Sequence, residues 1–161
     1  MIRTGIGFDA HRFAAGRRLV LGGVEIDHKS GLLGHSDADV LTHALIDALL
    51  GAVADGDIGS LFPDSDRQWK DADSLELLKA VVLRLQTKHQ AAVVNTDVTV
   101  IAEEPKLAAH IAAMRAKLAE CLGVNTGRVA VKATTVEQMG ALGRGEGIAA
   151  LAVATVECPE C

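Results

Sequence analysis

The sequence predicts a single α/β domain, an α+β sandwich in which one mixed β-sheet carries helices on one face. The strand–helix–strand pattern over residues 93–134 is typical of a right-handed crossover between parallel strands. The chain has 161 residues, of which 49% are hydrophobic and 23% charged. This length and composition fit one globular domain that spans residues 1–161.

The composition excludes several classes of protein. The longest apolar helical segment, Val40–Ala54, is interrupted by Thr42, His43 and Asp47, so no membrane partner is expected. The net charge is −5 and no basic cluster extends beyond Arg17–Arg18, which argues against a nucleic-acid partner. Three cysteines without a disulfide pattern, and an N-terminus without an apolar leader, favour a cytoplasmic location.

The core has to be built from small side chains. The only aromatic residues are Phe8, Phe13, Phe62 and Trp69, and the chain has no Tyr. A short chain with a core of Ala, Val, Leu and Ile gains stability by burying surface between subunits. We therefore expect an oligomer.

The N-terminal half is predicted to contain short strands, one helix and one long loop. Residues 1–9 predict a short strand, and Arg18–Ile26 predicts two extended pieces about a Gly-Gly turn. Gly31–Asp37 predicts a loop, and the apolar spacing of Ala38–Ala54 predicts a helix. Asp55–Asp73 is a polar loop of 19 residues, long enough to suggest a functional role.

The C-terminal half alternates helices and strands. A helix is predicted from Ser74 to His89, started by Asp73 and Glu76 in a variant of the capping box. Another is predicted from Pro105, which is acceptable in a first turn, to Gly123. The remaining predicted elements are three strands and a short helical turn: Val93–Ala102, Arg128–Thr134, Gly147–Glu157 and the turn Val136–Leu142.

Asp9, His11 and His43 form a candidate metal site. Residues i and i+2 of an extended segment point to one side, so Asp9 and His11 can hold one ion. His43 lies one turn after Asp39 on the predicted helix, and a carboxylate there could orient its second ring nitrogen. Two histidines and one carboxylate suit Zn²⁺ with an open fourth position. The alternative is a chance D-x-H pattern and a core histidine.

Two other patterns suggest phosphate chemistry. Ser36 or Asp37 would be the N-cap of the first helix, and its free amides, with His35 and Ser36, could contact phosphate. The alternative is plain helix capping. The adjacent hydroxyls that end at Thr135, followed by Glu137, look like a phosphate contact and a Mg²⁺ ligand. The alternative is a strand end with hydroxyl-stabilised turns.

Four patterns are less specific. Gly5-x-Gly7-x-x-Ala10 lacks the strand and helix of a dinucleotide-binding fingerprint, and Gly143-Arg-Gly-Glu-Gly147 leads into a strand. Cys158-Pro-Glu-Cys161 has neither a following helix nor a second pair, so we expect a frayed tail. Glu103-Glu104-Pro105-Lys106 could hold polar groups on free amides, or only begin a helix.

Seven motifs follow one another along nearly the whole chain: Gly7-Phe-Asp-x-His-Arg12, Gly34-His-Ser-Asp-Ala-Asp-Val40, Asp47-Ala-Leu-Leu-Gly51, Gly56-Asp-Ile-Gly59, Phe62-Pro-Asp-x-Asp66, Lys132-Ala-Thr-Thr135 and Gly143-Arg-Gly-Glu-Gly147. Taken together and in this order, they resemble the 2-C-methyl-D-erythritol 2,4-cyclodiphosphate synthase family of the non-mevalonate isoprenoid pathway.

The resemblance implies a homotrimer with active sites between adjacent subunits. It implies that the 2-phosphate of 4-diphosphocytidyl-2-C-methyl-D-erythritol 2-phosphate attacks the β-phosphorus of its own diphosphate, which closes the ring and releases CMP. Zn²⁺ on Asp9, His11 and His43 would polarise the β-phosphate. Mg²⁺ or Mn²⁺ on Glu137 would bridge the α- and β-phosphates.

The resemblance also implies roles for binding residues. His35 and Thr135 would stabilise the transition state, and Ser36 would touch phosphate. The residues implied to line the erythritol pocket are Asp57, Gly59, Phe62, Pro63, Asp64, Ser65 and Asp66. Those implied to hold cytidine across the subunit boundary are Ala102, Pro105, Lys106, Leu107, Ala108, Ala133 and Thr134.

One position departs from the family pattern. Arg144 and Phe8 would face a central channel on the trimer axis, proposed in the family to hold an isoprenoid diphosphate. This chain has Ala141-Leu142 where the family often has an aromatic residue, which questions lipid binding there but not catalysis. Two rival functions remain: a metal-dependent phosphohydrolase with water as the nucleophile, and a non-catalytic trimer with a structural zinc.

Overall fold

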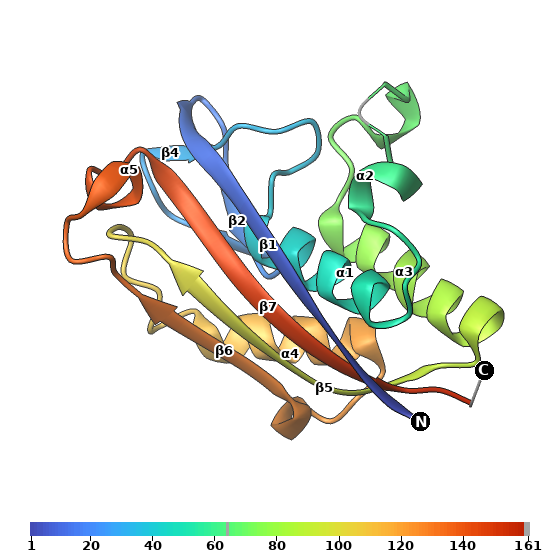
Figure 1. Cartoon of the computed structure of the whole chain (residues 1–161). Coiled ribbons are helices and arrows are strands. Elements are labelled where there is room, and N and C mark those ends of the chain that lie inside the picture. Colours follow the sequence, from blue (N-terminus) through green and yellow to red (C-terminus); the bar gives the residue numbers. More distant parts are fainter. Residues whose placement is uncertain (64, 160–161) are drawn as a thin grey trace.

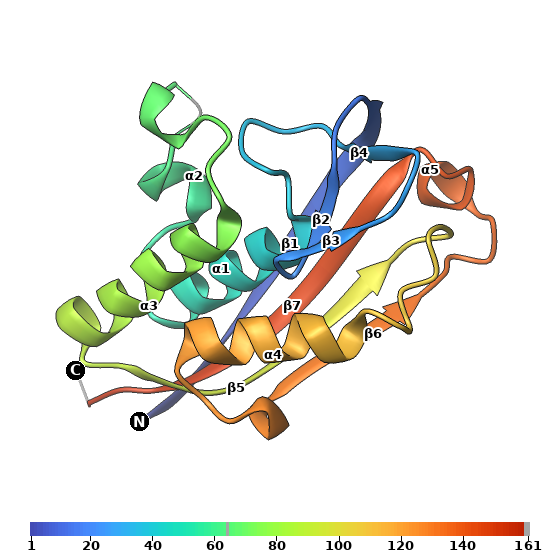
Figure 2. The same ribbon diagram turned by 180° about the vertical axis from the view of Figure 1, so that it is seen from behind.

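A five-stranded mixed sheet organises the chain. The structure is a computed structural model that describes residues 1–63 and 65–159. The sheet has the strand order β4-β1-β7-β5-β6, and Figures 1 and 2 show the long helices gathered on one of its faces. Its strands are β1 (Ile2–Ala15), β4 (Ser30–Leu32), β5 (Ala92–Ile101), β6 (Val129–Thr134) and β7 (Gly147–Glu157). The predicted fold class is confirmed.

The longest strands pair at the centre of the sheet. β1 runs antiparallel to β7 from Ile2 opposite Glu157 to Arg12 opposite Gly147. β5 is antiparallel to β7 and parallel to β6, so α4 (Ile111–Leu122) is the crossover of the predicted strand–helix–strand unit. A separate two-stranded sheet joins β2 (Leu19–Leu21) to β3 (Val24–Ile26) about the predicted Gly-Gly turn.

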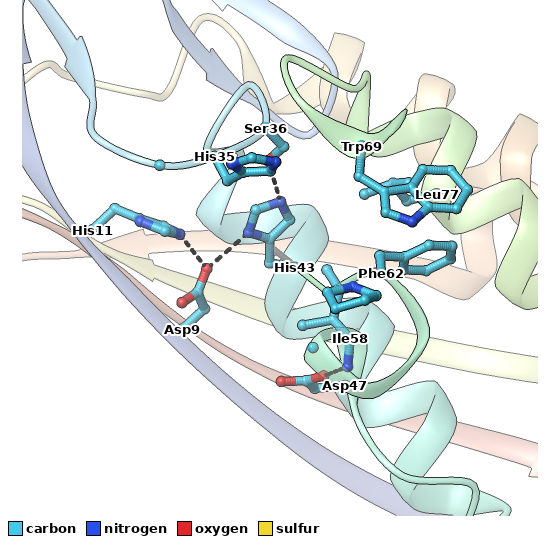
Figure 3. A pocket seen from close by; sticks show the side chains of 13 residues that line it. Asp9, His11, His35, Ser36, His43, Asp47, Ile58, Phe62, Trp69 and Leu77 are labelled. Atoms are coloured by element: carbon cyan, nitrogen blue, oxygen red, sulfur yellow. Dashed lines mark hydrogen bonds and ion pairs between the residues drawn. The ribbon is translucent and has the colours of Figure 1, made fainter. Parts of the chain in front are cut away.

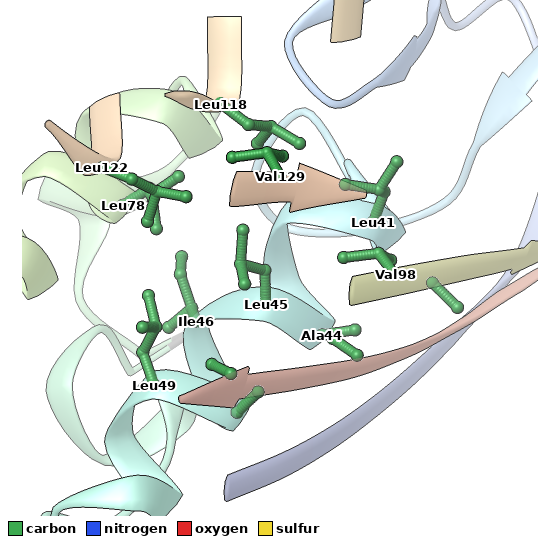
Figure 4. Packing of buried hydrophobic residues seen from close by; sticks show 14 of the residues in the cluster. Leu41, Ala44, Leu45, Ile46, Leu49, Leu78, Val98, Leu118, Leu122 and Val129 are labelled. Carbon is green, nitrogen blue, oxygen red and sulfur yellow. The ribbon is translucent and has the colours of Figure 1, made fainter. Parts of the chain in front are cut away.

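Helix α1 (Val40–Ala52) is the centre of the core. It is apolar nearly all round because it lies between β1 and β7 on one side and α3 (Ser74–His89) on the other. Its Leu41 and Leu45 belong to the same buried cluster as Leu118 of α4 (Figure 4). The remaining helices are short: α2 (Ile58–Leu61), α5 (Gly140–Gly143), and the 3₁₀ turns Arg67–Trp69 and Thr126–Arg128.

Two glycines of β1 allow α1 to lie directly on the strand. A Cβ atom built on Gly5 would lie 2.1 Å from the backbone oxygen of Ala48, and one on Gly7 would lie 2.0 Å from that of Ala44. No side chain fits in either place, because the obstacle is helix backbone that cannot move aside. The close approach of β1 to α1 therefore requires glycine at both positions.

The structure corrects several predicted boundaries. β1 is longer than residues 1–9 because its pairing with β7 continues to Arg12 and its end pairs with β4. β4 occupies the start of the segment predicted as a loop over Gly31–Asp37, and α2 and a 3₁₀ turn lie inside the predicted 19-residue loop. α5 begins at Gly140, later than the helical turn predicted from Val136.

The starts of two helices, and the capping of a third, also differ from prediction. α4 begins at Ile111 and not at Pro105, whose peptide bond with Glu104 is cis. Asp39 is the N-cap of α1, so the caps predicted at Ser36 or Asp37 are wrong. Asp73 caps α3 as predicted, but the Glu76 side chain pairs with Lys79 and does not complete a capping box.

Two expectations concern membranes and the C-terminal cysteines. Within residues 1–63 and 65–159, no helix has the length and apolar character needed to cross a membrane. Cys158 is a buried free thiol that follows β7, and its backbone pairs with Met1. Cys161 lies outside the described residues, so the frayed tail stays a prediction.

Within the part of the chain that the structure describes, the outer face of the sheet has no helix over it and carries apolar side chains. Ile6 and Phe8 of β1 are 66% and 59% exposed, and Leu151 and Val153 of β7 are each 39% exposed. These residues alternate with the glycines and alanines that face α1, so they form one apolar surface on paired central strands. We call this surface the outer sheet patch.

Replacing Gly7 by Ala tests the close approach of β1 and α1. We expect Gly7→Ala to lower the free energy of unfolding by about 3 kcal/mol or more, because its Cβ would collide with the helix backbone. Gly51→Ala is the matched control: the nearest atom to its Cβ would be 3.7 Å away, so stability should be unchanged or higher. Denaturant unfolding at one protein concentration measures both. Equal stability of the two variants would contradict the packing described above.

Candidate functional site

Asp9, His11 and His43 converge on one point between β1 and α1. Asp9 and His11 lie on the same side of β1, and His43 faces them from the first turns of α1 (Figure 3). One oxygen of Asp9, Oδ2, lies 2.9 Å from Nε2 of His11 and 3.1 Å from Nδ1 of His43. One ligand atom from each residue lies within 4.8 Å of the other two. The three residues predicted from the sequence as a metal site are thus brought together.

The charge state of Asp9 suits a metal ligand. Burial alone would raise the pKa of this carboxyl, but hydrogen bonds from His11 and His43, and their charge, hold it well below its ordinary value. Asp9 is therefore a carboxylate at neutral pH. An ionised, partly buried carboxylate beside two imidazoles is a donor set that Zn²⁺ prefers.

Hydrogen bonds from outside the cluster orient both imidazoles. Nδ1 of His11 lies 2.7 Å from the carbonyl oxygen of Leu33, which only accepts, so Nδ1 donates and Nε2 is the ring nitrogen that faces Asp9. Nε2 of His43 lies 2.8 Å from the Ser74 hydroxyl, which in turn donates to Asp37. Nε2 of His43 therefore donates to Ser74, and Nδ1 is the ring nitrogen that faces Asp9.

The cluster requires positive charge between its atoms. Nε2 of His11, Nδ1 of His43 and Oδ2 of Asp9 face the same space, so either protons on the imidazoles or a cation has to lie between them. The residues present therefore fit a metal ion with three protein ligands and an open position. This is the coordination pattern of a catalytic zinc site.

The orienting group predicted for His43 was wrong. The Asp39 carboxylate does not bond to the His43 ring; it is buried and accepts from the backbone of Gly22, Gly23 and Thr42 and from the Thr42 hydroxyl. Burial raises the pKa of Asp39. The hydroxyls of Ser36 and Ser74 take its place, at 3.1 and 2.8 Å from Nε2 of His43. No local spacing pointed to Ser74, because it lies on α3.

A pocket of about 370 Å³ opens beside the cluster (Figure 3). Of the predicted substrate residues, five line it: His35, Ser36, Gly59, Phe62 and Pro63. The Nε2 atom of His35 is buried and, among the described residues, has no hydrogen-bond partner. A buried donor or acceptor without a partner is costly, which suggests that a ligand satisfies it.

Three other predicted pocket residues do not line this pocket. Asp57 is exposed and caps α2, accepting from the Ser60 backbone, and Asp66 caps the following 3₁₀ turn. Ser65 is exposed, and Asp64 lies outside the described residues. Helix capping explains why acidic residues recur in this segment.

The predicted site residues did not include five residues of the pocket lining: Gly34, Asp47, Ile58, Trp69 and Leu77. Trp69 meets Phe62 edge to face, with ring centroids 4.9 Å apart, and the two rings form one wall. Asp47 accepts a hydrogen bond of 2.7 Å from the backbone N–H of Ile58 and so ties α2 to α1. Burial raises the pKa of Asp47. Leu77 of α3 completes the lining. The position of Trp69 in the polar loop was the one available signal.

The residues predicted to hold cytidine form a second pocket. This pocket of about 330 Å³ lies at the carboxyl ends of β5 and β6. Its lining contains every one of them, together with Thr135: Ala102, Pro105, Lys106, Leu107, Ala108, Ala133, Thr134 and Thr135. β7 and β5 separate β6 from β1, which places β6 about 14 Å from the strand that carries Asp9 and His11. The two pockets share no residue.

The remaining predicted residues follow β6. The Thr135 hydroxyl donates to the Glu137 carboxylate at 2.8 Å, so the candidate catalytic and cation-binding side chains are in direct contact. Arg144 lines a separate pocket of about 500 Å³ with Phe13, Lys29 and Glu103, and donates to Glu146. Within this chain Arg144 thus belongs to neither of the two pockets above.

The chain is similar to known synthases over nearly its whole length. The model of the YgbB family matches residues 2–157. A 2-C-methyl-D-erythritol 2,4-cyclodiphosphate synthase of Halalkalibacterium halodurans is 57% identical over 153 residues, which cover 95% of this chain and 97% of that protein.

Solved structures of related proteins superpose closely on this chain. The bifunctional IspDF of Campylobacter jejuni superposes with a TM-score of 0.94 at 43% identity, covering 99% of this chain and 43% of that longer chain. IspF of Plasmodium falciparum, solved as a CDP complex, superposes with a TM-score of 0.85 at 30% identity, covering 99% of this chain and 97% of that one. From the family match and these identities, the chain belongs to the YgbB family.

Proposed function

We propose that this protein is a 2-C-methyl-D-erythritol 2,4-cyclodiphosphate synthase of isoprenoid precursor biosynthesis. The observation that carries the proposal is the Asp9–His11–His43 cluster at the mouth of a pocket, in a chain 57% identical to such a synthase. An oxygen of the substrate's 2-phosphate bonds to the β-phosphorus while the bond from that phosphorus to the bridging oxygen breaks. The cyclic diphosphate forms, and CMP leaves with the bridging oxygen.

Positive charge has to be supplied locally. The protein has a net charge of −5, and the nucleophile and the group it attacks are both anionic. Zn²⁺ held by Asp9, His11 and His43, and Mg²⁺ or Mn²⁺ held by Glu137, would polarise the diphosphate and offset this repulsion. No side chain has to form a covalent intermediate, so the chain's contribution is positioning and electrostatic stabilisation.

Each pocket supplies a different part of the site. Ser36 and the partnerless Nε2 of His35 face the phosphates beside the metal cluster, and the Phe62–Trp69 wall encloses the erythritol portion. Lys106 and its neighbours bind cytidine, and Thr135 stabilises the transition state. In the P. falciparum relative, CDP is the bound ligand, which supports a cytidine diphosphate substrate here.

The same geometry supports a homotrimer with sites between subunits. The metal pocket and the cytidine pocket lie on strands separated by two others, so one substrate bridges them more readily across a subunit boundary than within one chain. The outer sheet patch supplies an apolar surface that association would bury.

In a reducing cytoplasm the free thiols of Cys121 and Cys158 stay unpaired.

The product distinguishes the synthase from a hydrolase. We expect purified protein, incubated with the diphosphocytidyl substrate and Mg²⁺, to give the cyclic diphosphate and CMP by phosphorus NMR. A zinc chelator should abolish both signals because the β-phosphate loses its polarising ion. CMP with linear phosphates would indicate a phosphohydrolase. No turnover by a zinc-loaded protein would favour a non-catalytic trimer with structural zinc.

Zinc affinity tests the cluster and its support. We expect His43→Ala to lose zinc and turnover, because two ligands remain. Ser74→Ala should weaken zinc binding about 10-fold to 100-fold, because Nε2 of His43 loses its oriented acceptor. Ser30→Ala, a serine on β4 away from this cluster, is the matched control. Competition with a chromophoric chelator measures all three. Equal zinc affinity for Ser74→Ala and Ser30→Ala would exclude the orienting role.

Mixing two inactive variants tests the shared site. His43→Ala removes a zinc ligand from the half of the site that one subunit supplies. Glu137→Ala, assayed at low Mg²⁺, removes the proposed Mg²⁺ ligand from the half that the neighbouring subunit supplies. Co-refolded at equal amounts, they should regain about a quarter of the sites, because some neighbouring subunits each supply an intact half. Sedimentation should show a trimer for each protein. A mixture as inactive as its components would place both halves of each site in one subunit.

A further inference from the structure

Glu103 lies where the carboxyl ends of two parallel strands meet. It follows β5 by two residues, and the turn at residues 135–138 follows β6. The backbone N–H of Ala102 donates to the carbonyl of Thr134 at 3.0 Å, so the two chains stay paired up to this point. α4 begins only at Ile111, so the Glu103 side chain does not start a helix.

One side-chain oxygen of Glu103 accepts hydrogen bonds from the backbone on both sides of Glu137. Oε1 of Glu103 accepts from the backbone N–H of Val136 at 3.2 Å and from that of Gln138 at 3.1 Å. These amides immediately precede and follow Glu137 in the chain. Two amide hydrogen bonds that converge on one side-chain oxygen fix the backbone on both sides of Glu137.

The 135–138 turn needs such support. Glu137 and Gln138 have φ angles of 52° and 61°, a left-handed conformation that residues other than glycine rarely adopt. Inside the turn, the Thr135 hydroxyl donates to Oε1 of Glu137 and accepts from the Glu137 backbone N–H at 3.3 Å. The internal bonds orient the Glu137 carboxylate relative to the turn, and Glu103 fixes the turn relative to the sheet.

We infer that Glu103 is a positioning residue that holds the 135–138 turn so that the Glu137 carboxylate is preset for a divalent cation. The inference rests on the proposed role of Glu137. Glu103 acts through the two backbone amides and does not itself ligate the cation. An amide side chain keeps the acceptor oxygen, so the hydrogen bonds, and not the charge of Glu103, carry the effect.

Two measurements on the zinc-loaded protein test the inference. Glu103→Ala should speed amide hydrogen exchange at Val136 and Gln138, and should weaken Mn²⁺ binding in the presence of CDP about tenfold, as followed by electron paramagnetic resonance. Glu103→Gln should restore both to within about threefold of the original chain. Glu104→Ala removes a neighbouring exposed carboxylate and should change neither.

The outcomes separate this inference from the proposed function. Unchanged exchange in Glu103→Ala, or Mn²⁺ affinity equal to that of Glu104→Ala, would overturn the positioning role. A loss that Glu103→Gln does not restore would show that charge carries the effect, and would also overturn it. Glu137→Ala should bind Mn²⁺ more weakly than any of these variants. If it binds normally, Glu137 is not the cation ligand, and the inference falls while the zinc and product experiments stand.

Discussion

The contact between α1 and β1 is the constraint on which the rest of the molecule depends. Gly5 and Gly7 remove every side-chain atom between the strand and the helix backbone, and Ala44 and Ala48 present the facing surface. This close approach of helix and strand is what allows Nδ1 of His43, on the helix, to lie 3.1 Å from Oδ2 of Asp9, on the strand. The convergence of Asp9, His11 and His43 is therefore a direct product of small-residue packing.

The Asp9–His11–His43 cluster also depends on hydrogen bonds to groups outside it. The Leu33 carbonyl and the Ser74 hydroxyl fix the proton positions of the two histidines, and Asp37 fixes the serine. Two segments distant in sequence, the loop at residues 33–37 and the start of α3, thus support one set of ligand atoms. Such support limits the rearrangement needed when an ion binds, because the two ring nitrogens already face the same space.

Elements set by local pattern were predictable from the sequence, and those set by distant pairing were not. α3 and β7 have the predicted bounds because an N-cap and an apolar period mark one, and the glycine-rich segment Gly143–Gly147 leads into the other. β1 was predicted too short because β7, at the far end of the chain, determines its length. The start of α4 was misplaced because Pro105 is as compatible with a turn as with a helix.

In the candidate site, too, local patterns were predictable from the sequence and contacts between distant segments were not. Asp9, His11 and His43 were predicted as ligands from spacing, but the identity of the group that orients His43 depends on where α3 packs. The roles of the erythritol and cytidine residues came from resemblance, and the structure gathers the cytidine set at the ends of β5 and β6. Glu103 carried a signal only as a helix start, because its contact with the 135–138 turn exists only in the folded sheet.

The scarcity of aromatic residues has a practical consequence. Trp69 is the only tryptophan in the chain, which contains no tyrosine, and it stands against Phe62 in the wall of the metal pocket. Nearly all near-ultraviolet emission of the protein therefore originates from this one indole. The intensity and wavelength of this emission therefore report solvent exposure and ligand binding at that wall of the pocket alone, without an added label.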